Sequence, residues 1–273
     1  MRGNRLSYDL NGLDPEGLVK LSDGTFWIAE ENGPSVTHFG ADGRMFVRYV
    51  PKGTETEFEG AHYEVRGILP PILTRRAINR GIEGLAVSPD EQFFYFIMQS
   101  PLVNPAVASF RAAKNARLFK IERGSMKIVG EYVYVLDDPR TFRRDPSDRQ
   151  SDVRISELMA VGHDRLVVDE RTDRTTKLYE INLNGATNIL DTKWDDPVTR
   201  PTLEQTLLRG NIKPLPKTLC LDSADVPGLQ GKTEGMALLG DGSLLLVNDN
   251  DFGISGERTQ IAVVGKEEIT CQW

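Results

Sequence analysis

A hairpin pattern that occurs four times is the feature that most constrains the fold of this 273-residue chain. The clearest copy spans Glu234 to Asn248: an apolar strand opens on Glu-Gly, a Gly-Asp-Gly turn follows, and a second apolar strand ends in polar residues. The other copies open at Glu16, Glu83 and Glu157. Two apolar strands around a Gly- or Asp-rich turn are typical of a β-hairpin. The sequence therefore predicts a protein built from internal β repeats.

Four such hairpins favour an all-β fold, the β-propeller, in which each hairpin forms the inner strands of one blade. We expect a single propeller domain over residues 1–273, a ring of four to six blades, and four recognisable repeats. The repeats are separated by long loop insertions, at residues 51–80, 100–115, 137–154 and 191–216. Loops of this kind carry function on a rigid scaffold.

Charge and hydropathy narrow the class of partner. The formal net charge of -7 argues against a nucleic-acid protein, which would need a basic surface. No run approaches the roughly 18 apolar residues of a membrane helix, and the first residues lack the apolar core of a signal peptide. We therefore expect a monomer that binds a small molecule or a cation.

The two cysteines, Cys220 and Cys271, leave two interpretations open. They are either two buried thiols or a disulfide that ties the carboxyl terminus to the last blade. A zinc site is not expected, because no histidine lies near them in the sequence.

The opening glutamates are the main functional signal. Carboxylates that face one central channel repel each other unless a cation or hydrogen-bond donors compensate them. An architectural role is the alternative, with Gly allowing close strand approach and Glu accepting backbone N–H bonds. Oxygen ligands without histidine favour Ca²⁺, or else Mg²⁺, over zinc. The predicted metal ligands are Glu16, Glu83, Glu157, Glu234 and Asp249.

The second strand of each hairpin ends in polar residues, which places these groups at one rim of the channel. Two arginines, Arg80 and Arg171, fall at the same rim by repeat alignment and would neutralise charge on a substrate oxyanion. The predicted catalytic residues are Glu30, Glu83, Glu170, Arg80 and Arg171, and the predicted substrate contacts are Glu31, Asn79, Gln99 and Asn250.

Several longer motifs resemble one known family, over about residues 10 to 264. They are Leu13–Gly17, Phe26–Ser35, Asn79–Ala86, Met98–Leu102, Ser151–Glu157, Thr176–Ile181 and Asn248–Gly253. The family is that of the phytase-like proteins described as having "esterase-like activity of phytase". The resemblance implies a β-propeller that is usually exported, to the periplasm or the medium, and that hydrolyses phosphate or other esters. It also implies that longer members carry a further amino-terminal blade.

Three functions are consistent with these observations. The first is a divalent-metal-dependent hydrolase of phosphate or carboxylic esters with an acidic central channel. The second is a lactonase-like enzyme, since sugar-lactonase propellers are similar in holding one divalent ion with inner-strand Glu, Asn and Asp. The third is a non-catalytic ligand-binding or scaffold propeller, because the fold alone implies no chemistry.

Overall fold

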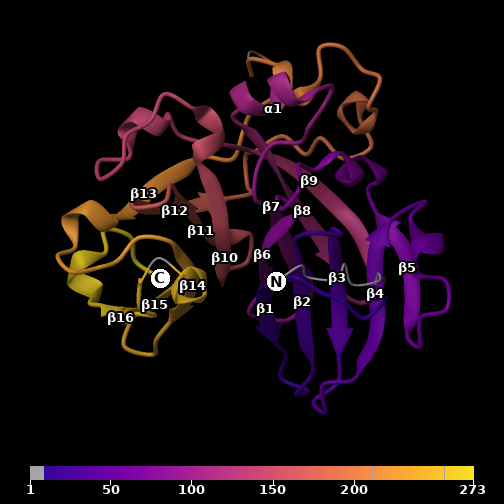
Figure 1. The fold of residues 1–273 in the computed structure, drawn as a ribbon, viewed down its shortest axis with the longest axis horizontal. Helices are drawn as coiled ribbons and strands as arrows, with labels where there is room; N and C mark the ends of the chain where they lie inside the picture. Colours follow the sequence, from indigo (N-terminus) through magenta and orange to yellow (C-terminus); the bar gives the residue numbers. More distant parts are fainter. Residues whose placement is uncertain (1–8, 209, 211, 255) are drawn as a thin grey trace, which may run out of the picture.

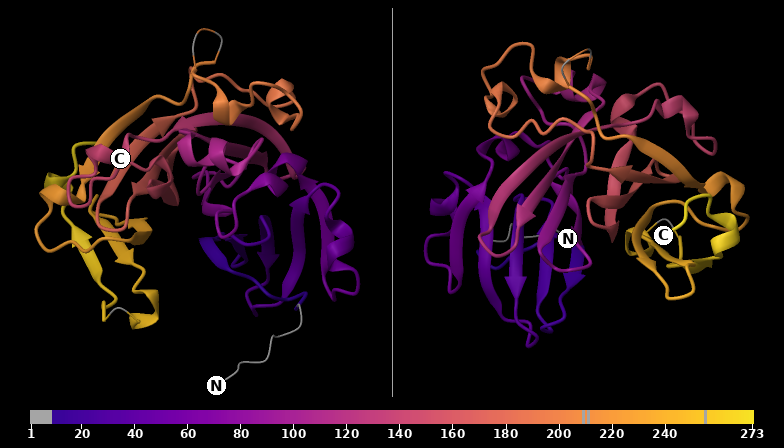
Figure 2. Two further views of the ribbon diagram at one scale, coloured as in Figure 1. Left: turned by 45° about the horizontal axis from the view of Figure 1, so that its top comes forward. Right: turned by 180° about the vertical axis from the view of Figure 1, so that it is seen from behind.

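The computed structural model describes residues 9–208, 210, 212–254 and 256–273, and sixteen strands in four sheets dominate these parts of the chain. The sheets lie around a common axis as the four blades of a β-propeller (Figure 1), which confirms the all-β prediction and sets the number of blades at four. Figure 2 shows blade one and blade four at the two ends of the arc that the sheets follow.

Each blade follows the order of the chain from its inner to its outer strand. Blade one contains β1 (Pro15–Lys20), β2 (Phe26–Glu30), β3 (Ser35–Phe39), β4 (Met45–Pro51) and β5 (Glu64–Leu69). Blade two contains β6 (Ile82–Val87), β7 (Phe93–Met98), β8 (Asn115–Glu122) and β9 (Lys127–Val135). Blade three contains β10 (Arg154–Gly162), β11 (Arg165–Arg171), β12 (Thr176–Asn182) and β13 (Lys217–Asp222). Blade four contains β14 (Thr233–Leu238), β15 (Leu244–Asn248) and β16 (Ile261–Val264).

The strand pairs are antiparallel except for β5, which runs parallel to β4 at the outer edge of blade one. The insertions between repeats fold into short helical segments. One is the α-helix α1 (Val107–Ala112), and the 3-10 turns are Glu55–Phe58, Pro71–Arg75, Pro139–Thr141, Gln150–Asp152, Lys193–Asp195, Leu203–Gln205, Ser223–Asp225, Asp251–Gly253 and Lys266–Glu268. Within the described residues, no helix is long and apolar enough to span a membrane.

An apolar core fills each space between neighbouring blades. Trp27 and Phe94 meet between blades one and two, with their ring centroids 4.5 Å apart. Tyr95 and Leu158 belong to the core between blades two and three, and Leu246 to the core between blades three and four. Because a fully buried side chain of this size contributes about 1.5–3 kcal/mol, these interfaces hold the blades in order.

Glycines allow the inner strands to approach each other closely. A Cβ atom on Gly17 would lie 2.4 Å from the backbone nitrogen of Leu85 in β6, and one on Gly84 would lie 2.6 Å from that of Leu158 in β10. The Gly of the Glu-Gly pairs is therefore architectural in blades one and two, and the neighbouring Glu is held beside the channel by this packing.

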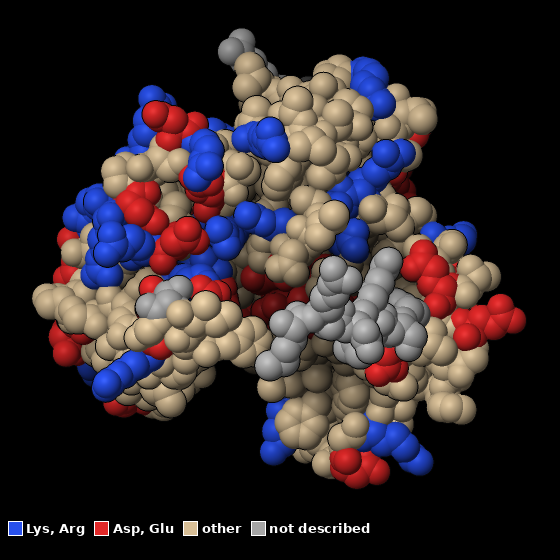
Figure 3. Space-filling view, in the orientation of Figure 1, with Lys and Arg blue, Asp and Glu red and all other residues tan. Residues whose placement is uncertain are grey.

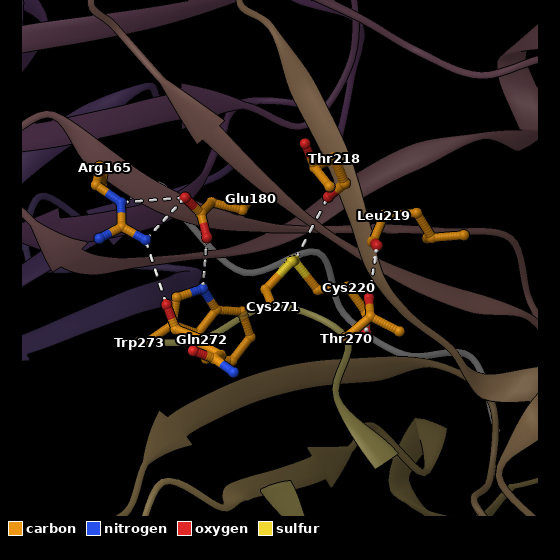
Figure 4. The surroundings of a disulfide bond; sticks show 9 residues. All are labelled: Arg165, Glu180, Thr218, Leu219, Cys220, Thr270, Cys271, Gln272 and Trp273. Atoms are coloured by element: carbon orange, nitrogen blue, oxygen red, sulfur yellow. Dashed lines mark hydrogen bonds and ion pairs between the residues drawn. A yellow bond between two sulfur atoms is a disulfide. The ribbon is translucent and has the colours of Figure 1, made fainter. Parts of the chain in front are cut away.

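The two cysteines form a disulfide, so the buried-thiol interpretation is wrong. Cys220 lies on β13 of blade three, and Cys271 lies in the tail after blade four (Figure 4). Near it, Trp273 Nε1 donates to Glu180 Oε2 at 2.9 Å and Thr270 Oγ1 donates to the Leu219 carbonyl at 2.9 Å. The carboxyl-terminal tail is thus fixed to the outer half of blade three.

Candidate functional site

A β-bulge at the start of each inner strand defines four equivalent positions beside the channel. The pairing register shifts between Pro15 and Leu18, between Ile82 and Gly84, between Ile155 and Glu157, and between Thr233 and Gly235. A bulge turns its extra residue out of the regular alternation of side chains. The bulged positions hold Glu16, Glu83, Ser156 and Glu234.

This register corrects the alignment of the third repeat. Ser156, and not Glu157, is the counterpart of the other opening glutamates, and Glu157 stands where blades two and four have Gly84 and Gly235. The third repeat lacks a Glu-Gly pair, so its only glutamate was matched to the others one residue too late. Three carboxylates and one hydroxyl therefore occupy the equivalent inner positions.

A second set of equivalent positions lies at the rim of the channel. In each blade this position is the residue that follows the second-strand member of the last regular pair before the bulge. The backbone N–H groups of Glu31, Gln99 and Asp249 donate to the carbonyl groups of the residues opposite them, and Arg171 pairs with Arg154 at the same place in blade three. The residues opposite Glu31, Gln99 and Asp249 are Asp14, Gly81 and Lys232. Charge at the rim thus differs from blade to blade.

Blade one supplies the acidic side of the channel. One carboxylate oxygen each from Asp14, Glu16 and Glu31 lies within 4.8 Å of the other two. Burial, with the nearby charges of Glu31 and Glu234, raises the pKa of Glu16 to about 8. Three carboxylates at this spacing are a donor set that suits a hard divalent cation.

Blade two extends this acidic cluster. The Gln99 side-chain amide donates to Glu31 Oε1 at 2.6 Å and to Glu83 Oε1 at 2.7 Å. Glu83 is 2% exposed, and its Oε2 has no hydrogen-bond partner within the described parts of the chain. Burial and the charges of Glu16 and Glu31 raise the pKa of Glu83 well above its usual range. Glu83 thus adds an unpartnered, buried carboxylate oxygen close enough to Glu16 and Glu31 to interact with their charges.

Two arginines, Arg154 on β10 and Arg80 just before β6, supply positive charge. Arg154 Nη2 lies 3.1 Å from Asp173, and its buried Nε has no partner among the residues described. Arg80 donates to Ser100 Oγ at 3.0 Å, and its pKa is lowered to about 10 by burial and then by the charge of Arg154. Two guanidinium groups that repel each other and keep a free donor suit an anionic ligand.

Arg171 is already occupied. Its Nε donates to Ser156 Oγ at 2.6 Å, its Nη1 to the Thr172 carbonyl at 3.3 Å, and its Nη2 forms an ion pair with Glu234. Lys232 likewise lies 3.2 Å from Asp249. These contacts neutralise two of the predicted metal ligands, Glu234 and Asp249. Arg154 is the cationic residue that the sequence analysis missed, although its pairing opposite Arg171 could be found by extending the repeat alignment.

Two predicted catalytic residues lie in structural networks outside this cluster. Glu30 accepts hydrogen bonds from Gly33 at 2.6 Å and from Arg48 at 3.3 Å. Glu170 accepts from the Asp137 backbone at 2.6 Å and from Lys217 at 2.8 Å. Both glutamates are at most 2% exposed, and burial raises the pKa of each although Arg48 and Lys217 act in the opposite direction.

The two remaining predicted contacts, Asn79 and Asn250, differ in setting. Asn79 is exposed, has a left-handed backbone with φ of 54°, and directly precedes Arg80. Asn250 is half-buried and follows Asp249 at the rim of blade four. In Figure 3, acidic side chains lie at the bottom of the hollow in the middle of this face, and basic side chains lie along its border.

Comparisons with known proteins identify the family. A secreted protein of Arthroderma benhamiae, described as uncharacterized, is 33% identical over 162 residues, which are 53% of this chain and 30% of that protein. This chain therefore spans less than a third of that relative.

The solved structures that resemble this chain are more distant. A Bacteroides caccae protein of unknown function gives a TM-score of 0.43 at 8% identity over 96% of this chain and 82% of its own. A virginiamycin B lyase from Staphylococcus aureus gives 0.35 at 13% identity, over 91% and 69%. Residues 2–252 match the Phytase-like sequence model, whose description is "Esterase-like activity of phytase". The chain belongs to the Phytase-like family.

Proposed function

We propose that this protein is a divalent-cation-dependent hydrolase of phosphate or carboxylic esters, with its site at the rim of the propeller channel. The observation that carries this proposal is that a cluster of carboxylates and a pair of guanidinium groups lie near each other beside the channel, close enough for Arg80 to interact with Glu31. Asp14, Glu16 and Glu31 gather on the blade-one side, and Arg80 and Arg154 gather near blade three. The family description, which names an esterase-like activity, supports the same class of reaction.

The carboxylates of Asp14, Glu16, Glu31 and Glu83 would hold the cation. Gln99 fixes the orientation of two of these ligands because its amide donates to both Glu31 and Glu83. Ca²⁺ fits this all-oxygen set, and Mg²⁺ is the alternative. When bound, such a cation supplies Lewis acidity that polarises an ester oxygen.

The arginines would bind the substrate. The free Nε of Arg154 and the guanidinium of Arg80 would donate to an anionic oxygen of the ester and would stabilise charge that grows on it during hydrolysis. Their mutual repulsion is relieved when an anion binds between them. Arg171 positions Glu234 and Ser156, since each of its three guanidinium nitrogens already contacts a protein oxygen.

The test is turnover of p-nitrophenyl phosphate and p-nitrophenyl acetate by the full chain, with Ca²⁺, with Mg²⁺ and with EDTA. We expect EDTA to abolish turnover, and Glu16→Gln and Arg154→Gln each to lower kcat/KM about 100-fold or more. Glu267→Gln, which removes an exposed carboxylate far along the chain from this cluster, is the matched control and should leave kcat/KM unchanged. Turnover that survives EDTA would contradict the proposal.

The lactonase-like alternative is supported by the same carboxylate cluster, so the substrate distinguishes it. Lactone opening releases acid without phosphate or an alcohol leaving group, and a pH-indicator assay on simple lactones detects it. If cations raise the melting temperature and neither assay gives turnover, the protein is a cation-binding scaffold, which is the third function considered.

We also propose that the protein works outside the cytoplasm, in the periplasm or the medium, as a monomer that acts on a small molecule. The Cys220–Cys271 disulfide supports an oxidising compartment, and the Arthroderma relative is described as secreted.

A further inference from the structure

A pair of carboxylates occupies positions that are apolar in the other blades. Glu157 on β10 pairs with Asp169 on β11. The corresponding pairs are Gly84 with Ile97 in blade two and Gly235 with Val247 in blade four. Register partners on adjacent antiparallel strands place their side chains on the same face of the sheet. Blade three therefore puts two acidic side chains on a face where its neighbours put a glycine and an aliphatic residue.

That face is the one that blade three turns towards blade four. In blade two, a Cβ on Gly84 would point at the Leu158 backbone of the next blade. By the same geometry, the side chain of Glu157 leaves β10 in the direction of β14. The charged groups that act on the pair agree with this location, since they are Arg171 and Glu170 on β11, Glu234 on β14, and Glu16 across the channel.

Among the residues described, the pair has few hydrogen-bond donors. Asp169 is 0% exposed, and within the described residues neither of its carboxylate oxygens has a hydrogen-bond partner. Glu157 is half-buried, and within the part of the chain that the structure describes its Oε1 accepts only from the Leu158 backbone, at 2.7 Å. Arg171 is the nearest cationic side chain in sequence, but its guanidinium is engaged by Ser156, Thr172 and Glu234. A buried carboxylate with both oxygens unpaired requires compensation by another group.

We propose that Glu157 and Asp169 bind a hard divalent cation, Ca²⁺, between blades three and four, as a second site separate from the Asp14, Glu16 and Glu31 cluster. One proton shared by the pair would engage a single oxygen of Asp169 and would leave the other unpaired. A cation instead contacts both Asp169 oxygens and a Glu157 oxygen together, and Ca²⁺ accepts bidentate carboxylates. The bound ion links β10 and β11 to the blade that carries Glu234.

The experiment is Ca²⁺ titration of the full chain by calorimetry, with the stoichiometry as the readout. We expect the wild type to bind two ions. Glu157→Gly installs the residue that blades two and four carry, and it should lose one ion and keep the other. Asp169→Asn should do the same. Glu16→Gln should lose the channel ion and keep the ion between the blades, so the two sites fail independently.

Each other result overturns the inference. If the wild type binds one ion and Glu16→Gln removes it, only the channel site exists. If Glu157→Gly and Asp169→Asn both bind two ions, the pair holds no cation. If the wild type binds none, both the inference and the cation of the proposed function are wrong. Circular dichroism shows whether each variant is folded. If Asp169→Asn does not fold, the number of ions bound by Glu157→Gly tests the inference.

Discussion

Arg117 shows, at the scale of the residue, how an insertion is attached to the propeller. Its guanidinium is 0% exposed and meets Glu131 Oε1 at 2.5 Å, Glu204 Oε1 at 3.2 Å and Asp195 Oδ1 at 3.7 Å. Glu131 belongs to β9, whereas Asp195 and Glu204 belong to the insertion of residues 191–216. One guanidinium cannot balance two buried carboxylates and a third that is half-buried, so burial and the nearby Asp195 carboxylate raise the pKa of Glu131 well above its usual range.

This raised pKa predicts how stability depends on pH. Folded Glu131 keeps a proton that the unfolded chain releases above about pH 4.5, so the free energy of unfolding falls as pH rises from there through the folded pKa. The contribution is at most about 1.4 kcal/mol per pH unit. Urea unfolding at pH 5 and pH 8 should show a smaller difference in Glu131→Gln than in the wild type. If the free energy of unfolding changes by the same amount between the two pH values in both proteins, Glu131 is ionised in the folded state.

Sequence reasoning identified most channel residues and failed where one repeat departs from the pattern. Glu16, Glu31, Glu83 and Gln99 lie in repeats that follow the pattern, and the structure brings them together, while their predicted roles stay predictions. In blade three, Ser156 replaces the glutamate at the bulge, and a one-residue shift exchanges the two faces of a strand. Residue types alone do not reveal such a shift, because it is fixed by pairing with β11.

At the scale of the element, neighbouring inner strands pack through small residues. A leucine on the inner strand of one blade lies beside the glycine on the inner strand of the preceding blade. Leu85 is 1% exposed beside Gly17, and Leu158 is 2% exposed beside Gly84. The corresponding leucine of blade one, Leu18, is 58% exposed. A Cβ on Gly235 would meet only Val247 Cγ1 within the described residues, at 2.6 Å. The two end blades therefore keep one strand face each without a neighbouring inner strand.

Alanine substitutions test this arrangement. Gly84→Ala forces a methyl group against the β10 backbone and should lower the free energy of unfolding by about 1–3 kcal/mol. Gly235→Ala meets a side chain that can rotate, so we expect a smaller loss in denaturant titration. Equal losses in the two variants would mean that another strand covers this face of β14 in solution.

The hairpins were predictable as elements because apolar runs and turn residues are local signals. Gly242, for example, has a φ of 86° in the turn between β14 and β15, a conformation that glycine adopts readily. The parallel strand β5 was not predicted, since its pairing with β4 depends on the path of a long insertion. Local composition does not contain that information.

Blade four, at the scale of the whole molecule, is enclosed by a covalent loop. The disulfide joins β13 to the tail across 51 residues of sequence, and all three strands of blade four lie within this span. Cross-linking restricts the unfolded chain, and for a loop of this length the chain-entropy estimate is about 4 kcal/mol. The sequence left this bond open because two cysteines allow pairing without requiring it.

Removal of the disulfide should weaken the fold. We expect the double variant Cys220→Ser with Cys271→Ser to lose about 4 kcal/mol of unfolding free energy at most, because residual structure in the unfolded chain reduces the entropic effect. Denaturant titration of the wild type with and without a reducing agent measures the same quantity. An unchanged midpoint in both comparisons would show that blade four is held by packing alone.

The enclosed loop also determines what a protease leaves behind. Phe252 and Ile254 are 97% and 83% exposed, between β15 and β16 and inside the span that Cys220 and Cys271 delimit. A single cut there divides the backbone, but the sulfur–sulfur bond still joins the two fragments. The nicked molecule therefore retains β16 and migrates as one species in a gel until it is reduced, so a protein cut in this exposed loop still has its fourth blade attached.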